Sequence, residues 1–295
     1  MKKTSIQKQL ADIIVDPNLT ESFILDNSKL PGPRANIELA IAIANELLPH
    51  IAKSPWKQHL LDWSEIDPSV APSNHPKEFL PFVATIALAT AYTSSNEDDR
   101  HLIDRVLRRS ANDPRWRSRE ACAMGLQSIG MQSPDDMLSI LKRWLTEPST
   151  YELRAVLAGL AHPPFLSNES IVTYAFESSR TAVESWLALT DKKPKQWVSR
   201  GTQSYGAIGV VDEGGSSDAL VALRKTLEYA PSVFVAADPQ RGFGMLADWL
   251  DCYGASVARI VASNLRKARL ARHFPRETED IGLRLEAAAS SDGLW

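Results

Sequence analysis

Residues 113–161 read DPRWRSREACAMGLQSIGMQSPDDMLSILKRWLTEPSTYELRAVLAGLA and contain an imperfect internal repeat. Trp116-x-x-Arg119 recurs 35 positions later as Tyr151-x-x-Arg154. Each copy follows an acidic residue and a proline, Asp113-Pro114 in the first and Glu147-Pro148 in the second. Helix pairs with a period of about 35–45 residues are typical of α-solenoids, in which each pair buries its apolar face against the next. The repeat therefore predicts an all-α fold, a right-handed α-solenoid (superhelix) of stacked helical hairpins.

Helix signals continue on both sides of this repeat. Apolar residues at helical spacing predict helices over residues 5–15, 35–52, 55–67, 79–92, 97–110, 114–131, 134–146, 149–161, 168–178, 180–189, 218–229 and 256–270. The helix over residues 79–92 is so apolar that we expect it to be buried on most sides. Asp16-Pro17-Asn18 predicts the end of the first helix, so residues 19–29 read as a loop. Two weaker patterns follow. Residues 196–211 are compatible with a glycine-bearing helix, and residues 233–237 form a strand-like run that is more easily interpreted as part of a short buried helix.

The repeats begin near residue 96 and fade after residue 272. We therefore expect one continuous solenoid domain with three parts. Residues 1–95 form an N-terminal helical cap, residues 96–272 form the repeats, and residues 273–295 form a peripheral C-terminal tail.

The composition is that of an ordinary globular protein. The chain has 295 residues, of which 44% are hydrophobic and 23% charged, and its formal net charge is -3. Overall electrostatics therefore do not point to nucleic acid or an anionic membrane. No run approaches the roughly 18 apolar residues that a membrane span requires. The N-terminal lysines lack the apolar core of a signal peptide. The two cysteines lie within helical pattern and indicate neither a disulfide framework nor a thiolate metal site. We expect a cytoplasmic protein without cofactor or metal.

The first copy of the repeat resembles the second helix of a HEAT repeat. That family places an aspartate at the turn inside each repeat and an arginine six positions later, as Asp113 and Arg119 stand here. The alanines and leucine that follow, Ala121-x-Ala123-x-x-Leu126, extend the match. The whole chain also resembles uncharacterised bacterial HEAT-repeat proteins. The resemblance implies HEAT-like hairpins over roughly residues 97–270 and brings no activity with it.

A second, more distant resemblance is to the alkylpurine DNA glycosylases built from HEAT-like repeats. They carry a Trp-x-x-Arg-Ala-Ala stretch, which Trp116–Ala121 resembles with glutamate at Glu120. In that family the arginine faces DNA on the concave side, and Arg119 is the matching position. Trp63 and Asp67 have the spacing of the family's upstream Trp-x-x-x-Asp element, but they lie at a helix end in a different region.

Arg119 and Arg154 lie on the apolar side of their predicted helices. An arginine in that position is costly unless it is paired. The turn acids Asp113 and Glu147 are the expected partners, which favours a structural ladder of ion pairs. The alternative is that these arginines contact a ligand.

Basic residues gather in two further groups. The first comprises Arg100, Arg105, Arg108, Arg109, Arg115, Arg117 and Arg143. The second comprises Arg259, Arg266, Lys267, Arg269 and Arg272. If both groups line the inner face of the solenoid, they form a groove for phosphate. The alternative is a solvated surface balanced by nearby acidic residues.

Two other features have a functional and a structural interpretation. The rigid stretch Leu30-Pro31-Gly32-Pro33-Arg34 precedes a helix N-terminus, where it holds an anion or simply starts the helix. The tryptophans are either stacking platforms for bases or core residues, and their helical spacing favours the core for most of them. Trp197, beside three lysines, is the one we expect to be exposed.

The sequence shows no nucleophile, metal-ligand or phosphate-loop motif, and we name no catalytic or metal-binding residue. We therefore expect a non-catalytic binding or scaffold protein that uses its concave face to bind a macromolecule, either protein or nucleic acid. The alternative is a DNA-binding protein of DNA repair, related to the HEAT-like glycosylases. A small-molecule enzyme is a third possibility. The candidate binding residues are Arg105, Arg108, Arg109, Arg115, Trp116, Arg119, Arg154, Arg266, Lys267 and Arg269.

Overall fold

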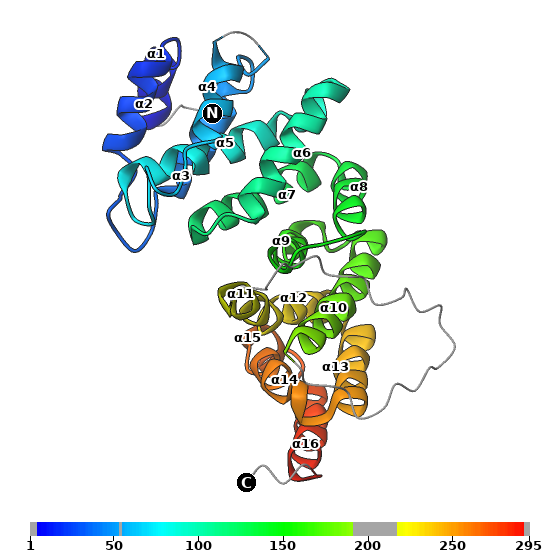
Figure 1. The fold of residues 1–295 in the computed structure, drawn as a ribbon. Helices are drawn as coiled ribbons and strands as arrows, with labels where there is room; N and C mark the ends of the chain where they lie inside the picture. The colour runs from blue at the N-terminus through cyan, green and yellow to red at the C-terminus, as the bar shows by residue number, and fades with distance from the viewer. Residues whose placement is uncertain (1–4, 53–54, 191–216, 292–295) are drawn as a thin grey trace. The chain divides into compact units, whose positions relative to one another are not determined.

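The structure is a computed structural model that describes residues 5–52, 55–190 and 217–291. All regular secondary structure in these residues is helical, which confirms the predicted all-α class. The chain divides into two compact units, Met1–Ile140 and Leu141–Trp295 (Figure 1). Trp197 and the helix expected over residues 196–211 lie outside the described residues.

The helices before the boundary are α1 Ser5–Ile13, α2 Pro17–Asp26, α3 Ile37–Leu47, α4 Trp56–Ser64, α5 Phe79–Thr90, α6 Glu97–Ala111 and α7 Trp116–Gln132. Helix α8, Pro134–Trp144, contains the boundary. The later helices are α9 Thr150–Leu160, α10 Glu169–Leu189, α11 Ser217–Leu227, α12 Ala230–Ala237, α13 Pro239–Tyr253, α14 Ala258–Leu265, α15 Ala268–Ala271 and α16 Pro275–Ser291. Short 3-10 turns are η1 Pro76–Glu78, η2 Tyr92–Ser94, η3 Pro163–Phe165 and η4 Gly254–Val257.

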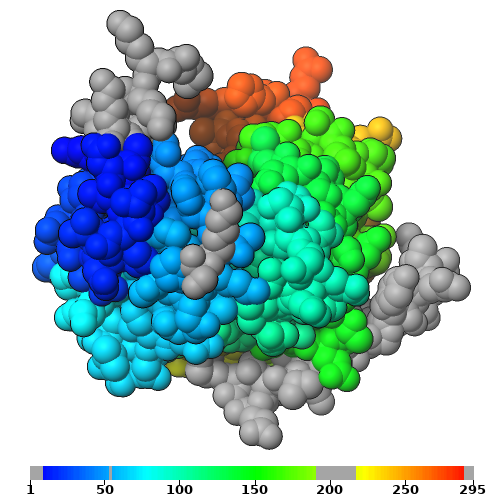
Figure 2. Space-filling view, turned by 90° about the horizontal axis from the view of Figure 1, so that it is seen from above, coloured from blue at the N-terminus to red at the C-terminus, as the bar shows by residue number. Residues whose placement is uncertain are grey.

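The first unit is built around α5. Its sequence, FLPFVATIALAT, carries no charge, and every residue in it is buried. Helices α2, α3, α4, α6 and α7 all contact it. An apolar helix without a polar face must be covered on all sides, so the buried position predicted for this segment is confirmed. In the space-filling view the blue N-terminal residues pack directly against the light-blue residues that follow them in the chain (Figure 2).

Helices α6 and α7 contact each other as the predicted hairpin. Asn96 caps α6 by accepting a hydrogen bond from the Asp99 amide at 2.9 Å. The hairpin closes tightly at Gly125 of α7. A Cβ atom there would lie 2.8 Å from Leu107 Cδ2 of α6 and 2.9 Å from Ala89 Cβ of α5. Only glycine permits this approach without displacing a neighbour.

The second unit has its own buried centre in α12. Residues Ala230–Val235 are buried, and α9, α10, α11, α13, α14 and α15 contact this helix. The short buried helix predicted around residues 233–237 is therefore confirmed. The later part of the chain forms α16, which contacts α13, α14 and α15 and buries Ile281.

Three predicted elements are wrong in detail. Residues 19–29 are not a loop, because Pro17 begins α2 and Asp16 caps it by accepting from the Asn18 amide at 2.8 Å. Proline at the first helical position is a start signal rather than a stop. Residues 169–189 form one helix that continues through Ser179, whose hydroxyl is satisfied within the helix by the Ala175 carbonyl at 2.7 Å. Residues 256–270 are not one helix but are divided among η4, α14 and α15.

The stacking of the two repeat copies stays a prediction. The first copy begins α7 in the first unit, and the second begins α9 in the second unit. Among the described helices, none combines the length and the apolar character needed to cross a membrane.

Candidate functional site

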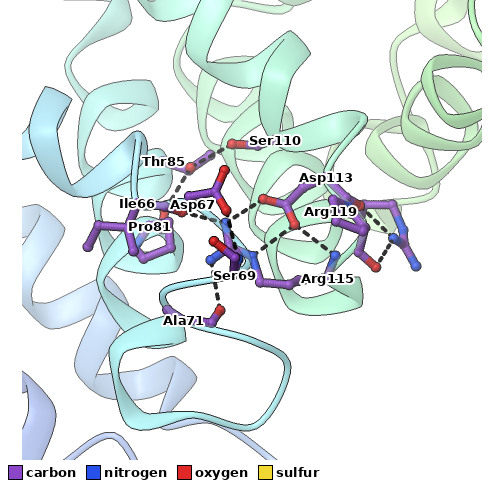
Figure 3. A network of polar contacts seen from close by, with 11 residues as sticks. Ile66, Asp67, Ser69, Ala71, Pro81, Thr85, Ser110, Asp113, Arg115 and Arg119 are labelled. Carbon is purple, nitrogen blue, oxygen red and sulfur yellow. Dashed lines mark hydrogen bonds and ion pairs between the residues drawn. The ribbon is translucent and has the colours of Figure 1, made fainter.

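The start of α7 holds three of the predicted arginines, and Arg115 is the most buried of them. It is 3% exposed. Its Nε and Nη2 donate to the two Asp113 carboxylate oxygens at 2.9 and 2.6 Å. Its remaining donors reach the main-chain carbonyls of Ala71 and Ile66 at 3.1 and 3.0 Å (Figure 3). Arg115 therefore ties the connector after α4 to the start of α7.

The same network contains a second acid, Asp67, which lies at the surface. Its pKa is lowered by hydrogen bonds from the hydroxyl and the amide of Ser69, and the positive charge of Arg115 lowers it further. The hydrogen bond from the Ser69 amide to Asp67 Oδ1 measures 2.7 Å. Nearby, the hydroxyls of Thr85 and Ser110 bond at 2.9 Å between α5 and α6 (Figure 3). The network binds elements of the first unit to one another.

Arg117 is the second buried arginine, at 4% exposure. Its Nη1 pairs with Glu78 Oε2 at 3.0 Å, and Glu78 is fully buried. Its Nη2 donates to the Gly32 carbonyl at 2.6 Å. The Trp116 ring covers this guanidinium with its centroid 4.4 Å away, and the ring itself is 48% exposed. The Trp116 ring therefore packs against the Arg117 guanidinium, which Glu78 and the Gly32 carbonyl hold in place.

The stretch Leu30–Arg34 has a structural role in these contacts. The Gly32 amide donates to Asn74 Oδ1 at 2.8 Å, so it is not directed at an anion. A Cβ at Gly32 would lie 2.5 Å from the Lys29 carbonyl oxygen, which requires glycine there. Helix α3 starts after Asn36, whose side chain accepts from the Leu39 amide at 3.3 Å. The interpretation of this stretch as a helix start agrees with these contacts.

Arg119 was expected to pair with the Asp113 carboxylate, but that carboxylate holds Arg115. The Arg119 Nη1 donates instead to the main-chain carbonyls of Asp113 and Pro114 at 2.6 and 2.8 Å. Arg119 is half-buried. The sequence offered one missed signal, the two-residue spacing between Asp113 and Arg115. The other partner, Glu78, is 39 residues from Arg117 and carries no local signal.

The remaining predicted arginines have varied exposure. On α6, Arg105 is exposed, Arg108 is half-buried, and Arg109 pairs with Glu65 at 2.9 Å. On α9, Arg154 is half-buried. An exposed pair such as Arg109–Glu65 contributes little to stability, about 0–1 kcal/mol.

In the second unit, the structure brings two predicted residues together around Tyr229. Tyr229 lies in the turn between α11 and α12 and is 45% exposed. The Arg269 guanidinium lies 4.8 Å from the ring centroid, and its Nη2 donates to Tyr229 Oη at 3.2 Å. The Lys267 Nζ lies 5.7 Å from the same centroid. Arg266 is exposed immediately before Lys267. We call Tyr229, Arg266, Lys267 and Arg269 the Tyr229 cluster.

No family model, curated protein or solved structure matches this chain. The contacts of the cationic side chains therefore distinguish the candidate sites. All three nitrogens of the Arg115 guanidinium and the two Nη atoms of Arg117 already donate to groups of the protein. In the described part of the chain, Lys267 and Arg269 contact the Tyr229 ring and no carboxylate. Cations without a matching anion beside an exposed phenol can bind an anionic group.

A buried asparagine fixes the cluster. Asn264 of α14 is fully buried. Its Oδ1 accepts from the Ser232 amide at 2.8 Å, and its Nδ2 donates to the carbonyls of Leu227 and Ile260, both at 2.8 Å. Leu227 and Ser232 lie on either side of Tyr229. Asn264 therefore attaches the turn that carries Tyr229 to the helix that precedes Lys267.

We expect Asn264→Ala to lower the free energy of unfolding of the second unit by about 2 kcal/mol, because it leaves buried main-chain groups without partners. Chemical denaturation followed by circular dichroism measures the change. The neighbouring substitution Ser263→Ala is the control. That half-buried hydroxyl accepts one hydrogen bond from the exposed Arg266, at 3.3 Å, and its loss should cost less than about 0.5 kcal/mol. Equal effects of the two substitutions would contradict the role of Asn264.

Among the described residues, no group of histidine, cysteine, aspartate and glutamate is arranged to hold a metal ion. Of the described tryptophans, Trp56, Trp63, Trp144, Trp186 and Trp249 are at most 6% exposed. The prediction that most tryptophans belong to the core is confirmed for this part of the chain. Trp116 is the exception.

Proposed function

We propose that this chain is a non-catalytic binding protein that recognises an anionic macromolecule through the Tyr229 cluster. The observation that carries the proposal is the pairing of two cations, Lys267 and Arg269, with an exposed tyrosine instead of a carboxylate. Tyrosine and arginine are also enriched among the residues that dominate binding energy in interfaces.

The local charge supports this assignment. Glu228 precedes Tyr229, but its Oε1 already accepts from Arg224 and from Arg259 Nε, the latter at 2.9 Å. Its negative charge is therefore matched by two other cations. Within the residues that the structure describes, Lys267 and Arg269 therefore have no carboxylate partner, and their positive charge is left for a ligand.

The proposal includes the architecture expected from the repeat, a right-handed α-solenoid of HEAT-like hairpins whose concave face binds the partner. It is supported by the α6–α7 hairpin and by the matching position of the two repeat copies at helix starts. A cytoplasmic location is proposed with it.

Binding of labelled polyanions to the full chain tests the proposed function. The probes are polyglutamate, a single-stranded oligonucleotide and duplex DNA, each titrated at low salt and followed by fluorescence anisotropy. We expect at least one probe to bind and the double variant Lys267→Ala/Arg269→Ala to weaken that binding at least tenfold. The control Arg276→Ala removes an exposed cation from α16 and should change binding less than about threefold. Absence of binding to all probes, or equal binding by the double variant, refutes the proposal.

The duplex probe also tests the alternative based on Arg119. If duplex DNA binds and Arg119→Ala abolishes that binding while the folded fraction is unchanged, the protein is a DNA-binding protein that uses the start of α7. In that case the Tyr229 cluster is not the principal site.

A further inference from the structure

The chemistry of the Tyr229 cluster distinguishes among anionic partners. The carboxylates of a glutamate-rich polypeptide are bound by cations, and its side chains offer no flat face that would stack on the exposed Tyr229 ring. Duplex DNA offers phosphates but keeps its base faces stacked inside the helix. Single-stranded nucleic acid offers both phosphates and free base faces, and proteins bind it with positive charge and aromatic platforms together.

The geometry of the cluster provides both elements. The Tyr229 ring and the Arg269 guanidinium form one platform, since the guanidinium lies over the ring and donates to its hydroxyl. Bases stack on aromatic rings and on guanidinium planes alike. Two further cations precede Arg269 in the chain. The Lys267 ammonium lies 5.7 Å from the ring centroid, and the exposed Arg266 donates to Ser263 Oγ at 3.3 Å, so both supply positive charge for phosphate.

The platform is also held in place before a ligand arrives. Its tyrosine lies on one segment and its cations on another. Asn264 joins the two by two hydrogen bonds of 2.8 Å, to the Ser232 amide and the Leu227 carbonyl. The Ser232 hydroxyl adds a bond to the Tyr229 carbonyl at 2.7 Å. A platform fixed in this way loses little conformational freedom on binding.

We infer that the Tyr229 cluster binds single-stranded nucleic acid, with a base stacked on the Tyr229–Arg269 platform and phosphates bound by Arg266 and Lys267. This inference rests on the proposed function and names its partner. The ribose or deoxyribose backbone makes no difference to these contacts, so RNA and DNA are separate arms of the test.

The experiment compares four probes of equal charge with the full chain: single-stranded DNA, single-stranded RNA, an abasic oligodeoxynucleotide and polyglutamate. We expect the single-stranded probes to bind at least tenfold more tightly than the abasic strand and polyglutamate. Tyr229→Leu should weaken binding of base-bearing strands about tenfold and leave abasic binding unchanged, since stacking on one aromatic ring contributes about 1–3 kcal/mol. Tyr229→Phe retains the ring and should bind within about threefold of the wild type.

Each of the other outcomes overturns the inference, and each points to a different property of the cluster. If the abasic strand binds as tightly as the base-bearing strands, the cluster recognises phosphate alone. If polyglutamate binds most tightly and needs Lys267 and Arg269, the partner is an acidic protein and the proposed function stands. If no probe depends on the cluster, both proposals fail. Circular dichroism and the melting temperature of each variant show whether it is folded. If Tyr229→Leu is not, Tyr229→Ala provides a second variant without the ring and should show the same loss for base-bearing strands.

Discussion

Arg117→Ala is expected to lower the free energy of unfolding of the first unit by about 3–5 kcal/mol. The reason is the position of its partner. Glu78 is fully buried, and its Oε2 accepts from Arg117 and from the Asn74 amide at 2.6 Å. Without the guanidinium, a carboxylate stays inside the protein with no cation beside it. The substitution also removes the cation beneath the Trp116 ring.

Hydrogen exchange of the full chain measures this loss of stability separately for the first and the second unit. Peptides from α5 and α7 should exchange faster in Arg117→Ala, while peptides from α12 and α13 report on the second unit. The exposed Arg105 on α6 gives a matched control, because Arg105→Ala removes the same charge at the surface and should cost less than about 0.5 kcal/mol.

A double variant separates the buried charge from the shape of the site. Arg117→Met with Glu78→Gln removes both charges and keeps similar volumes, so it should be more stable than Arg117→Ala alone. If Arg117→Ala costs less than about 1 kcal/mol, or if the double variant is less stable than the single one, the buried pair does not hold the unit together as described.

Gly242→Ala is expected to destabilise the second unit by about 3 kcal/mol or more. Gly242 lies where α13 crosses α12, and a Cβ there would be 2.5 Å from Val235 Cα and 2.9 Å from Val235 Cβ. The obstructing atoms belong to the backbone and to a β-branched residue of the central helix. They cannot rotate away, so the two helices must separate.

The same helix supplies a close control in Gly244. A Cβ at Gly244 meets nothing within 4 Å, and the residue is exposed. Because alanine is the better helix former, Gly244→Ala should be neutral or stabilising by up to about 1 kcal/mol. Urea denaturation measures the free energy of unfolding of Gly242→Ala and Gly244→Ala. Similar stabilities of the two variants would contradict the close approach of α12 and α13.

The sequence predicted helices well where a local signal determines them. The uncharged run of α5 determines its burial, and the asparagine before α6 determines where that helix starts. Pro17 is ambiguous in the sequence, because proline is compatible with both the end of one helix and the beginning of the next. The capping bond of Asp16 decides between them, and that bond is a matter of geometry rather than of residue type.

The candidate site was harder to predict, for a physical reason. Arg115, Arg117 and Arg119 look alike in the sequence, yet the first two are buried and the third is half-buried. Distant segments cover Arg115 and Arg117, whereas the carbonyls that Arg119 Nη1 contacts lie five and six residues before it. Lys267 and Arg269 are recognisable as cations in the sequence, but Tyr229 is 40 residues from Arg269 and has no pattern that indicates its exposure. A long-range contact of this kind appears only when the intervening helices are packed.

The contact between Arg117 and Gly32 spans 85 residues and has a consequence for synthesis on the ribosome. When the segment up to residue 95 has left the exit tunnel, Glu78 still lacks the cation that neutralises it. The nascent chain therefore cannot complete its first folded body until α7 has emerged. Until then the uncharged helix α5 is not covered by α7 and stays accessible to chaperones. A fragment that ends before α7 should therefore be degraded by proteases rather than fold stably.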